Sequence, residues 1–243
     1  MSNICYKYDN QETPNYYYYI AEECFIISDR ILCINYCEEY DIIKKIQKNE
    51  DDFFDFSKNF IDVGSDDGNY AMLLDFKHNY CFEPNKRAAC ILHANMYLKN
   101  KVYNTDVYND ILSDNNEDVS FDGFTCNNDS LRESYENHAV FEGVHTVKAK
   151  TLDSYDFKNV GFIKIDVEGF EEKVIRGGLL TIIKNDYPPI LFECWDVGNY
   201  NMTAEKHDSL FNLLKVLDYE ILEHWGDHET HLAIHKSKLK NNQ

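Results

Sequence analysis

Charged residues recur near the ends of two apolar stretches in the second half of the chain. The stretch GFIKIDVEGFE (161–171) alternates apolar residues with Lys164, Asp166 and Glu168, and the later stretch PPILFEC carries Glu193. Alternation with a period of two is typical of a β-strand. Because the carboxyl ends of parallel strands meet at one edge of a sheet, we expect these side chains to share a ligand-binding rim. Carboxylates there can take a substrate proton or accept hydrogen bonds, and Lys164 can keep them ionised.

A turn with two glycines follows an earlier apolar stretch. The segment FIDVGSDDGNY (60–70) places Asp62, Gly64, Ser65 and Gly68 between a predicted strand and a predicted helix. Glycines allow a ligand to approach the backbone, whose amides point outward in such a turn. The spacing is GxxxG and not the GxGxxG of dinucleotide folds, so no pyrophosphate-binding turn is predicted. An aspartate before the first glycine suits a cationic group better than a phosphate.

Glu83 ends the next predicted strand, 19 residues after Gly64. A carboxylate at that position can accept hydrogen bonds from the two vicinal hydroxyls of a ribose. Together, the loop and Glu83 describe an adenosine-bearing ligand whose other end is an amino acid, and S-adenosylmethionine fits this description. The alternatives are a glycine turn that binds nothing and a solvated carboxylate.

The predicted elements that position these residues alternate between strands and helices. Strands are expected at 59–63, 79–83, 102–108, 160–167 and 188–194, and helices at 69–76, 85–100, 169–185 and from a Thr203 cap to about Leu217. Two further strands flank the turn WGDHET. This alternation predicts an α/β fold with a mostly parallel sheet, helices on both faces and a terminal antiparallel hairpin.

The chain is expected to comprise one main domain with an N-terminal appendage. The appendage covers 1–58, with short strands at 17–21, 24–27 and 30–35 and a helix at 37–50. The main domain covers 59–243. Its polar segment at about 113–145 has little periodicity and is expected to form an irregular insertion or a surface hairpin.

Composition narrows the classes of partner. The chain has 243 residues, 44% of them hydrophobic, and a net charge of -19. This charge repels phosphate backbones and anionic lipids, so neither nucleic acid nor a membrane is an expected partner. The sequence has no apolar run near the roughly 20 residues that span a bilayer and no signal peptide pattern. The eight cysteines are scattered, which favours a reducing compartment, the cytoplasm.

Six segments of the chain resemble FkbM-type methyltransferases in wording and order. They are IDVGSDDGNY, CFEPN, HANMYLKN, TLDSY, IKIDVEGFEEKVIRGG and ILFE, and they run from about Phe60 to Glu193. The resemblance implies a class I, Rossmann-like fold with a seven-stranded sheet. It also implies methyl transfer from S-adenosylmethionine to a hydroxyl oxygen, often of a sugar. The chain departs from the family where it reads GSDDG, since the family usually reads close to GANxG.

The resemblance also implies roles for individual residues. Asp62, Gly64, Ser65 and Gly68 would surround the methionine end of the cofactor, and Glu83 would hold its ribose. Asp110 and Ile111 would lie beside the adenine.

The expected catalytic residues are Lys164, Asp166 and Glu193, and their roles remain open at this stage. Asp166 would hold the cofactor amine or take the acceptor proton, while Glu193 would bind sugar hydroxyls or act as the base. A purely structural Lys164–Asp166 ion pair is the alternative. His145 is another candidate base.

Metal sites are not predicted. Asp166, Glu193 and Asp196 are oxygen ligands that a divalent cation could use, but such carboxylates also bind sugars. The histidines at 224, 228, 231 and 235 are expected to be exposed and non-functional, because a zinc site needs convergent geometry.

The expected partner is a small-molecule or glycan acceptor, and the oligomeric state is left open. Two rival functions remain. One is a non-catalytic cofactor- or glycan-binding module on the same fold, and the other is a nicotinamide-dependent enzyme.

Overall fold

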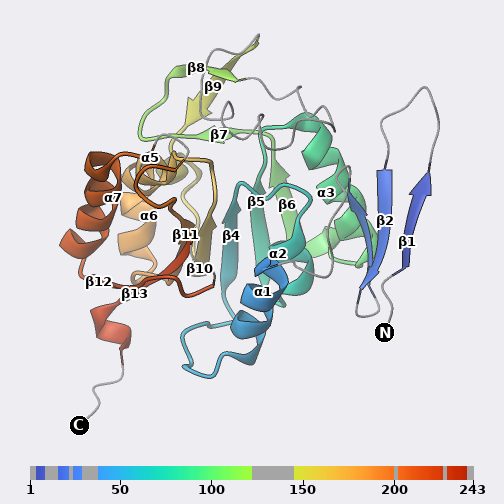
Figure 1. The fold of residues 1–243 in the computed structure, drawn as a ribbon, viewed down its shortest axis with the longest axis horizontal. Coiled ribbons are helices and arrows are strands. Elements are labelled where there is room, and N and C mark those ends of the chain that lie inside the picture. Colours follow the sequence, from blue (N-terminus) through green and yellow to red (C-terminus); the bar gives the residue numbers. More distant parts are fainter. Residues whose placement is uncertain are drawn as a thin grey trace.

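The computed structural model describes residues 4–8, 16–21, 24–28, 38–121, 145–199, 202–226 and 229–239. Their centre is a mostly parallel sheet (Figure 1), which confirms the predicted α/β fold. In this described part the sheet has seven strands in the order β12-β13-β11-β10-β4-β5-β6. The bounds are β4 (Asn59–Val63), β5 (His78–Phe82), β6 (Thr105–Tyr108), β10 (Val160–Ile165), β11 (Ile190–Glu193), β12 (Tyr219–Leu222) and β13 (Thr230–His235). β13 runs antiparallel to both β11 and β12, as the predicted terminal hairpin requires.

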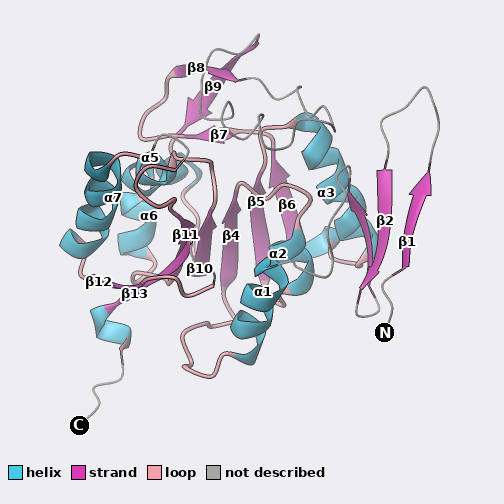
Figure 2. Ribbon diagram, viewed as in Figure 1, coloured by secondary structure: helices cyan, strands magenta, loops and turns pink. Residues whose placement is uncertain are grey.

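Helices cover both faces of the sheet (Figure 2). One face packs against α1 (Glu38–Lys48), α2 (Asn69–Leu73) and α3 (Lys86–Leu98). The other packs against α5 (Glu171–Gly177), α6 (Leu179–Lys184) and α7 (Ala204–Val216). The predicted Thr203 cap is present, because its side chain accepts a hydrogen bond from the backbone NH of Lys206 at 3.2 Å.

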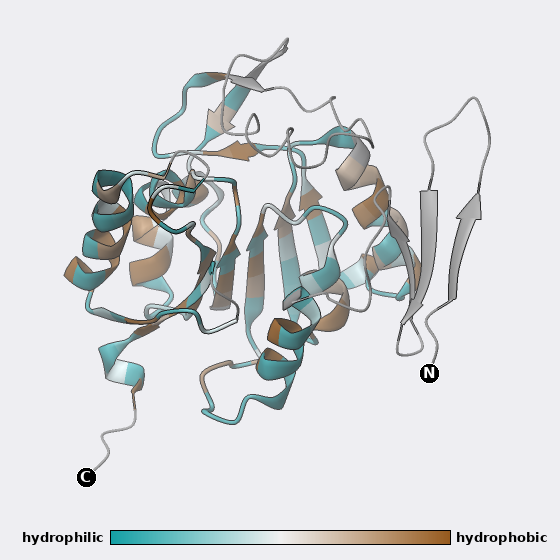
Figure 3. Ribbon diagram, in the orientation of Figure 1, coloured by the Kyte–Doolittle hydropathy of each residue, from teal (hydrophilic) through white to brown (hydrophobic). Residues whose placement is uncertain are grey.

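The alternation of residues along the central strands divides the core between the two faces. Apolar segments concentrate in these strands (Figure 3). Phe60 on β4 and Phe162 on β10 stack with ring centroids 4.9 Å apart on the α1–α3 face. On that same face the next positions toward the carboxyl ends are Asp62 and Lys164, which are register partners. The sheet therefore places charged residues where its apolar core ends.

Two predicted elements differ from the observed ones near Gly169. The strand predicted at 160–167 ends at Ile165, and the backbone then turns through Glu168 and Gly169, whose φ angles are 56° and 95°. The single helix predicted at 169–185 is instead two helices that meet at Gly178. A Cβ on the preceding Gly177 would lie 2.0 Å from the backbone oxygen of Ser113, so the helix break lies where the chain packs against the β7 segment.

Two other elements are shorter than predicted or begin as another type. The helix expected at 69–76 ends at Leu73, because Leu74 is extended. The strand expected at 102–108 begins as a 3-10 turn, η2 (Val102–Asn104). Two more such turns are η3 (Leu152–Tyr155) and η4 (Lys236–Lys238).

The N-terminal segment forms a small antiparallel sheet beside α3 (Figure 1). Its strands are β1 (Ile4–Tyr8), β2 (Tyr16–Ala21) and β3 (Cys24–Ser28). The strands predicted at 17–21 and 24–27 are confirmed, β1 was not predicted, and 30–35 lies outside the described residues. Ile42, Ile43 and Ile46 of α1 are at most 2% exposed and share a core with Phe60. Helix α1 therefore packs on the main sheet, and the expected boundary at 58 stays a prediction.

A short separate sheet spans the two ends of the predicted insertion at about 113–145. Its strands are β7 (Ile111–Leu112), β8 (Asp118–Phe121) and β9 (His145–Lys150), in the order β7-β9-β8. Of these strands, only β8 lies wholly within the predicted bounds. Residues 122–144 lie outside the described part. Among the described helices, none combines the length and apolar character needed to cross a membrane.

Candidate functional site

The turn after β4 passes close to the end of β10. Gly64 has φ 74°, and a Cβ there would lie 1.7 Å from the backbone oxygen of Asp166. The backbone NH groups of Gly64 and Ser65 both donate to the Phe82 carbonyl at 3.0 Å. Gly68 closes the turn by donating its NH to the Ser65 carbonyl at 2.8 Å. The first glycine is therefore required by both its φ angle and the contact with the neighbouring strand.

Asp62 is a buried carboxylate without hydrogen-bond donors. It is 0% exposed, and among the residues that the structure describes neither of its carboxylate oxygens has a hydrogen-bond partner. Its nearest cation is Lys164, whose Nζ lies 3.6 Å from Oδ1. Burial raises the pKa of Asp62 to about 6, although Lys164 opposes that rise. A buried carboxylate of this kind lacks donors that a cationic ligand would supply.

Lys164 is the ammonium group at the centre of this site. Its Nζ donates to the Gly64 carbonyl at 2.7 Å and lies 3.4 Å from Oδ2 of Asp166. It also lies 5.3 Å from the centroid of the Tyr70 ring. Burial alone would lower the pKa of Lys164, but the carboxylates of Asp166, Asp62 and Glu39 raise it above its ordinary value. The lysine thus stays charged, as its expected neutralising role requires.

Glu83 holds two loops of the site together. Its Oε2 accepts from the backbone NH of Asp66 at 2.9 Å, and its Oε1 accepts from that of Asn85 at 2.8 Å. Asn109 adds a third link, because its side-chain Nδ2 donates to the Glu83 carbonyl at 2.7 Å. Its two carboxylate oxygens thus bind the backbone on both sides of the end of β5, and its contact with a ribose stays a prediction.

Glu193 lies on the rim among other carboxylates. Burial, followed by Asp166, Glu168 and Glu171, raises the pKa of Glu193 to about 11. Its Oε2 is buried without a hydrogen-bond partner. Glu193 is therefore protonated at neutral pH in the ligand-free protein, and it can act as a base only after a nearby positive charge lowers that pKa.

Glu171 supports the loop that carries Asp166, and the sequence analysis did not identify it. Its Oε1 accepts from the backbone NH groups of Val167 at 3.0 Å and Gly169 at 3.2 Å. Glu171 is 2% exposed, and burial raises its pKa to about 7. The motif DVEGFE contains this carboxylate, but only the fold shows that it turns back onto its own loop.

Asp110 and Ile111 follow β6, next to the strand end that carries Glu83. Oδ2 of Asp110 accepts from Lys150 Nζ at 2.9 Å and from the Tyr155 hydroxyl at 2.7 Å. Ile111 begins β7 and pairs with Ala149 of β9. The Asp110 carboxylate thus already has two donors within the protein. The predicted contact of Asp110 and Ile111 with adenine stays a prediction.

The tail histidines were expected to be exposed, but His231 is buried and contacts the backbone. His231 is 3% exposed, its Nε2 lies 3.2 Å from the Cys194 carbonyl, and its Nδ1 accepts from the backbone NH of His224 at 3.2 Å. Burial lowers the pKa of His231. His228 and the side chain of His145 lie outside the described part. In the residues that the structure describes, no group of three or more His, Cys, Asp or Glu side chains could hold a metal ion.

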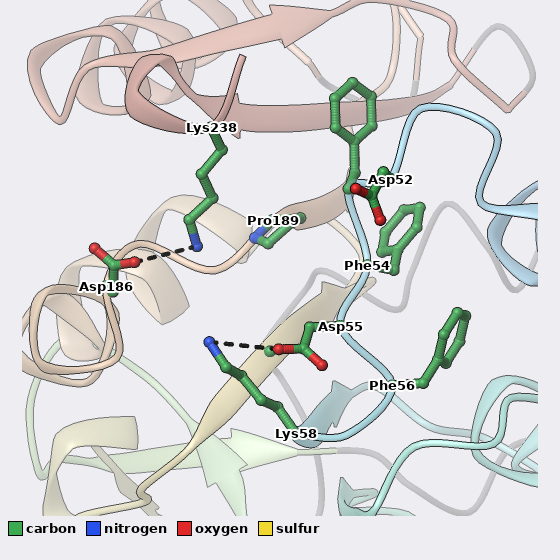
Figure 4. A pocket seen from close by; sticks show the side chains of 10 residues that line it. Asp52, Phe54, Asp55, Phe56, Lys58, Asp186, Pro189 and Lys238 are labelled. Atoms are coloured by element: carbon green, nitrogen blue, oxygen red, sulfur yellow. Dashed lines mark ion pairs between the residues drawn. The ribbon is translucent and has the colours of Figure 1, made fainter. Parts of the chain in front are cut away.

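A separate open pocket of about 390 Å³ lies at the amino ends of β4, β10 and β11. Lys58 and Lys238 extend into it, and each is ion-paired, with Asp55 at 3.8 Å and with Asp186 at 3.9 Å (Figure 4). None of the predicted site residues lines this pocket. The chemistry-bearing residues instead gather at the opposite, carboxyl edge of the sheet.

Known proteins resemble this chain in sequence and in fold. Residues 62–221 match the model of the methyltransferase FkbM domain. The methyltransferase FkbM from Methylobacillus flagellatus KT has a similar structure, with 18% identity and a TM-score of 0.52 over 73% of this chain. The chain spans only 43% of that protein.

Two further solved structures are similar at lower scores. One is an S-adenosylmethionine-dependent O-methyltransferase from Thermotoga maritima (12% identity, TM-score 0.43, 80% of this chain and 55% of that chain). The other is an O-methyltransferase from Bacillus cereus in complex with S-adenosylhomocysteine (10% identity, TM-score 0.43, 81% and 78%). No curated protein is significantly similar in sequence. Because the family model matches more than half of the chain, this protein belongs to the FkbM methyltransferase domain family.

Proposed function

We propose that this protein transfers a methyl group from S-adenosylmethionine to a hydroxyl oxygen of a sugar or glycan. The observation that carries the proposal is Asp62, a fully buried carboxylate with two unpartnered oxygens at the carboxyl edge of the sheet. In that position it can accept hydrogen bonds from the α-ammonium group of the cofactor. Glu83 lies at the end of the neighbouring strand, and we propose that its carboxylate accepts hydrogen bonds from the ribose hydroxyls.

The cofactor supplies an electrophilic methyl group on a sulfonium, which is already a good leaving group. The protein must then align the acceptor oxygen and accept or share its proton. Asp166 and Glu193 are the proposed groups for this task, because Asp166 is ion-paired with Lys164 and acts electrostatically on Glu193 at the same edge of the sheet. Glu193 would donate a hydrogen bond while protonated and would become a base when positive charge lowers its pKa.

The charge of the rim supports a neutral acceptor. Asp166, Glu168, Glu171 and Glu229 all act electrostatically on Glu193. A phosphorylated acceptor would be repelled by these carboxylates, whereas sugar hydroxyls can donate hydrogen bonds to them.

We also propose that residues 1–58 and 113–145 shape acceptor specificity, because acceptor pockets are commonly built from such segments. The buried thiols of Cys81 and Cys194 are free, which supports a reducing compartment such as the cytoplasm.

A screen for methyl transfer tests the proposal. The protein would be incubated with methyl-labelled S-adenosylmethionine and with neutral glycans, nucleotide sugars, small hydroxylated metabolites and RNA. We expect label on a hydroxyl of a neutral sugar. Transfer to RNA alone would refute the acceptor class. Cofactor binding without transfer to any acceptor would favour the non-catalytic binding module.

A further inference from the structure

A residue outside the matched family region reaches the site. Glu39 lies in the first turn of α1, whereas the family model begins at 62. Its Oε2 accepts a hydrogen bond from Nδ2 of Asn69 at 3.0 Å. Asn69 begins α2 directly after Gly68, the last glycine of the loop that follows β4. Helix α1 thus reaches the end of the predicted cofactor loop through the hydrogen bond between Glu39 and Asn69.

The amide of Asn69 has one satisfied end and one unsatisfied end. Asn69 is 5% exposed, and its Oδ1 is buried without a hydrogen-bond partner. Its Nδ2 donates to Glu39, and this contact fixes which end of the amide is the acceptor. A buried acceptor without a donor is destabilising, so its presence requires an explanation.

Asn69 and Asp62 both carry buried oxygen atoms that accept no hydrogen bond from the described residues. Both oxygens of Asp62 are also buried acceptors without donors. Lys164, Asp166 and Asp66 act electrostatically on Glu39 and on Asp62 alike, so the two carboxyl groups face the same charged centre. The Lys164 ammonium does not satisfy these acceptors, because it lies 3.6 Å from Asp62 and donates to the Gly64 carbonyl. Asn69 is tied to this charged cluster through Glu39, and its Oδ1 together with the two oxygens of Asp62 gives three acceptors, the number of N–H donors of an ammonium group.

We propose that Glu39 is a positioning residue that turns the Asn69 carbonyl oxygen toward the α-ammonium group of the cofactor. Asn69 and Asp62 would then bind that ammonium group together. This assignment rests on the proposed function, and it adds α1 and Asn69 to the cofactor site. It also gives α1 a role beyond covering the sheet.

The test compares two ligands that share the adenosine thioether. S-adenosylhomocysteine carries the amino-acid end, and 5′-methylthioadenosine lacks it. We expect Asn69→Ala and Glu39→Ala each to weaken S-adenosylhomocysteine binding about tenfold, because hydrogen bonds to charged groups are stronger than neutral ones. Binding of 5′-methylthioadenosine should be unchanged. Asp41→Ala is the matched control, since Asp41 is an exposed carboxylate on the same helix.

A double-mutant cycle tests whether Glu39 acts through Asn69. The Glu39→Ala/Asn69→Ala variant should bind S-adenosylhomocysteine no more weakly than Asn69→Ala alone. Glu39→Gln should restore most of the affinity, because its carbonyl oxygen can still accept from Asn69 Nδ2. If an alanine variant fails to fold, Glu39→Leu, which also lacks the acceptor, or Asn69→Ser takes its place in the ligand comparison.

Three outcomes would overturn the assignment. Equal weakening of both ligands would show a merely structural role, and additive losses in the cycle would show that Glu39 does not act through Asn69. Unchanged binding of S-adenosylhomocysteine to Asn69→Ala would remove Asn69 from the site. If the wild-type protein binds neither ligand, the proposed function itself fails, which is a distinguishable result.

Discussion

Asp62→Asn is expected to stabilise the ligand-free protein at neutral and alkaline pH while it weakens cofactor binding. Asp62 is fully buried, its oxygens lack hydrogen-bond donors, and burial raises its pKa from 3.8 to about 6. A carboxyl group whose pKa is raised on folding lowers stability as the pH rises from its unfolded pKa to its folded pKa. Below the unfolded pKa the group is protonated in both states, and this loss is absent.

The size of the effect follows from the pKa difference. A shift from 3.8 to about 6 corresponds to about 3 kcal/mol of stability lost on full ionisation, at about 1.4 kcal/mol per pH unit. Roughly half of this loss falls between about pH 5 and about pH 8. Asn69, Lys164 and the other carboxyl groups remain in the variant. The change with pH in the stability difference between the wild type and Asp62→Asn therefore reports mainly Asp62.

The assay is thermal or urea unfolding of the ligand-free wild-type and Asp62→Asn proteins at those two pH values. The variant should gain about 3–6 °C in Tm relative to the wild type between the lower and the higher pH. Its affinity for S-adenosylhomocysteine should fall about 10- to 100-fold. Asp41→Asn serves as the exposed control. The reasoning is refuted if the wild type gains stability relative to Asp62→Asn as the pH rises.

Four other substitutions, of which Gly198→Ala is a comparison for Gly64→Ala, test separate features. Gly64→Ala should destabilise the protein by more than about 3 kcal/mol in urea unfolding, because its Cβ would lie 1.7 Å from the Asp166 oxygen. Gly198→Ala should cost only about 1–2 kcal/mol, since its φ is 100° but nothing lies within 4 Å, and similar losses for the two variants would contradict this contrast. Glu83→Gln should weaken S-adenosylhomocysteine and 5′-methylthioadenosine alike, about tenfold, because both carry ribose, and an effect on only one ligand would exclude the ribose role. Glu193→Gln should change stability at neutral pH by less than about 0.5 kcal/mol, because a pKa of about 11 already keeps the carboxyl group protonated, yet methyl transfer should fall at least tenfold. Normal turnover would remove Glu193 from catalysis.

The alternation of residues in the sequence was sufficient to predict the sheet and its charged edge. The apolar run at 59–63 predicted the strand that carries Asp62, and the alternation at 160–167 predicted the strand that carries Lys164. The observed register makes these two residues partners. The glycine loop and Glu83 follow from strand ends and turn residues. These features depend on residues that are close in the sequence, where local preferences decide the structure.

Contacts between distant segments could not be predicted in the same way. The bond between Glu39 and Asn69 joins residues 30 positions apart, and no periodic pattern indicates it. The helix break at Gly178 depends on how the chain packs against Ser113. The protonation of Glu193 depends on burial and on the summed charges of several loops. Tertiary packing decides all three, and a single sequence shows no local signal for it.

A calorimetric titration of the wild-type protein with S-adenosylhomocysteine, and with NAD in parallel, tests the central claim most directly. We expect one S-adenosylhomocysteine per chain with a Kd on the order of micromolar, and no heat of binding for NAD. The absence of S-adenosylhomocysteine binding at about millimolar ligand, or tighter binding of NAD, would contradict the account.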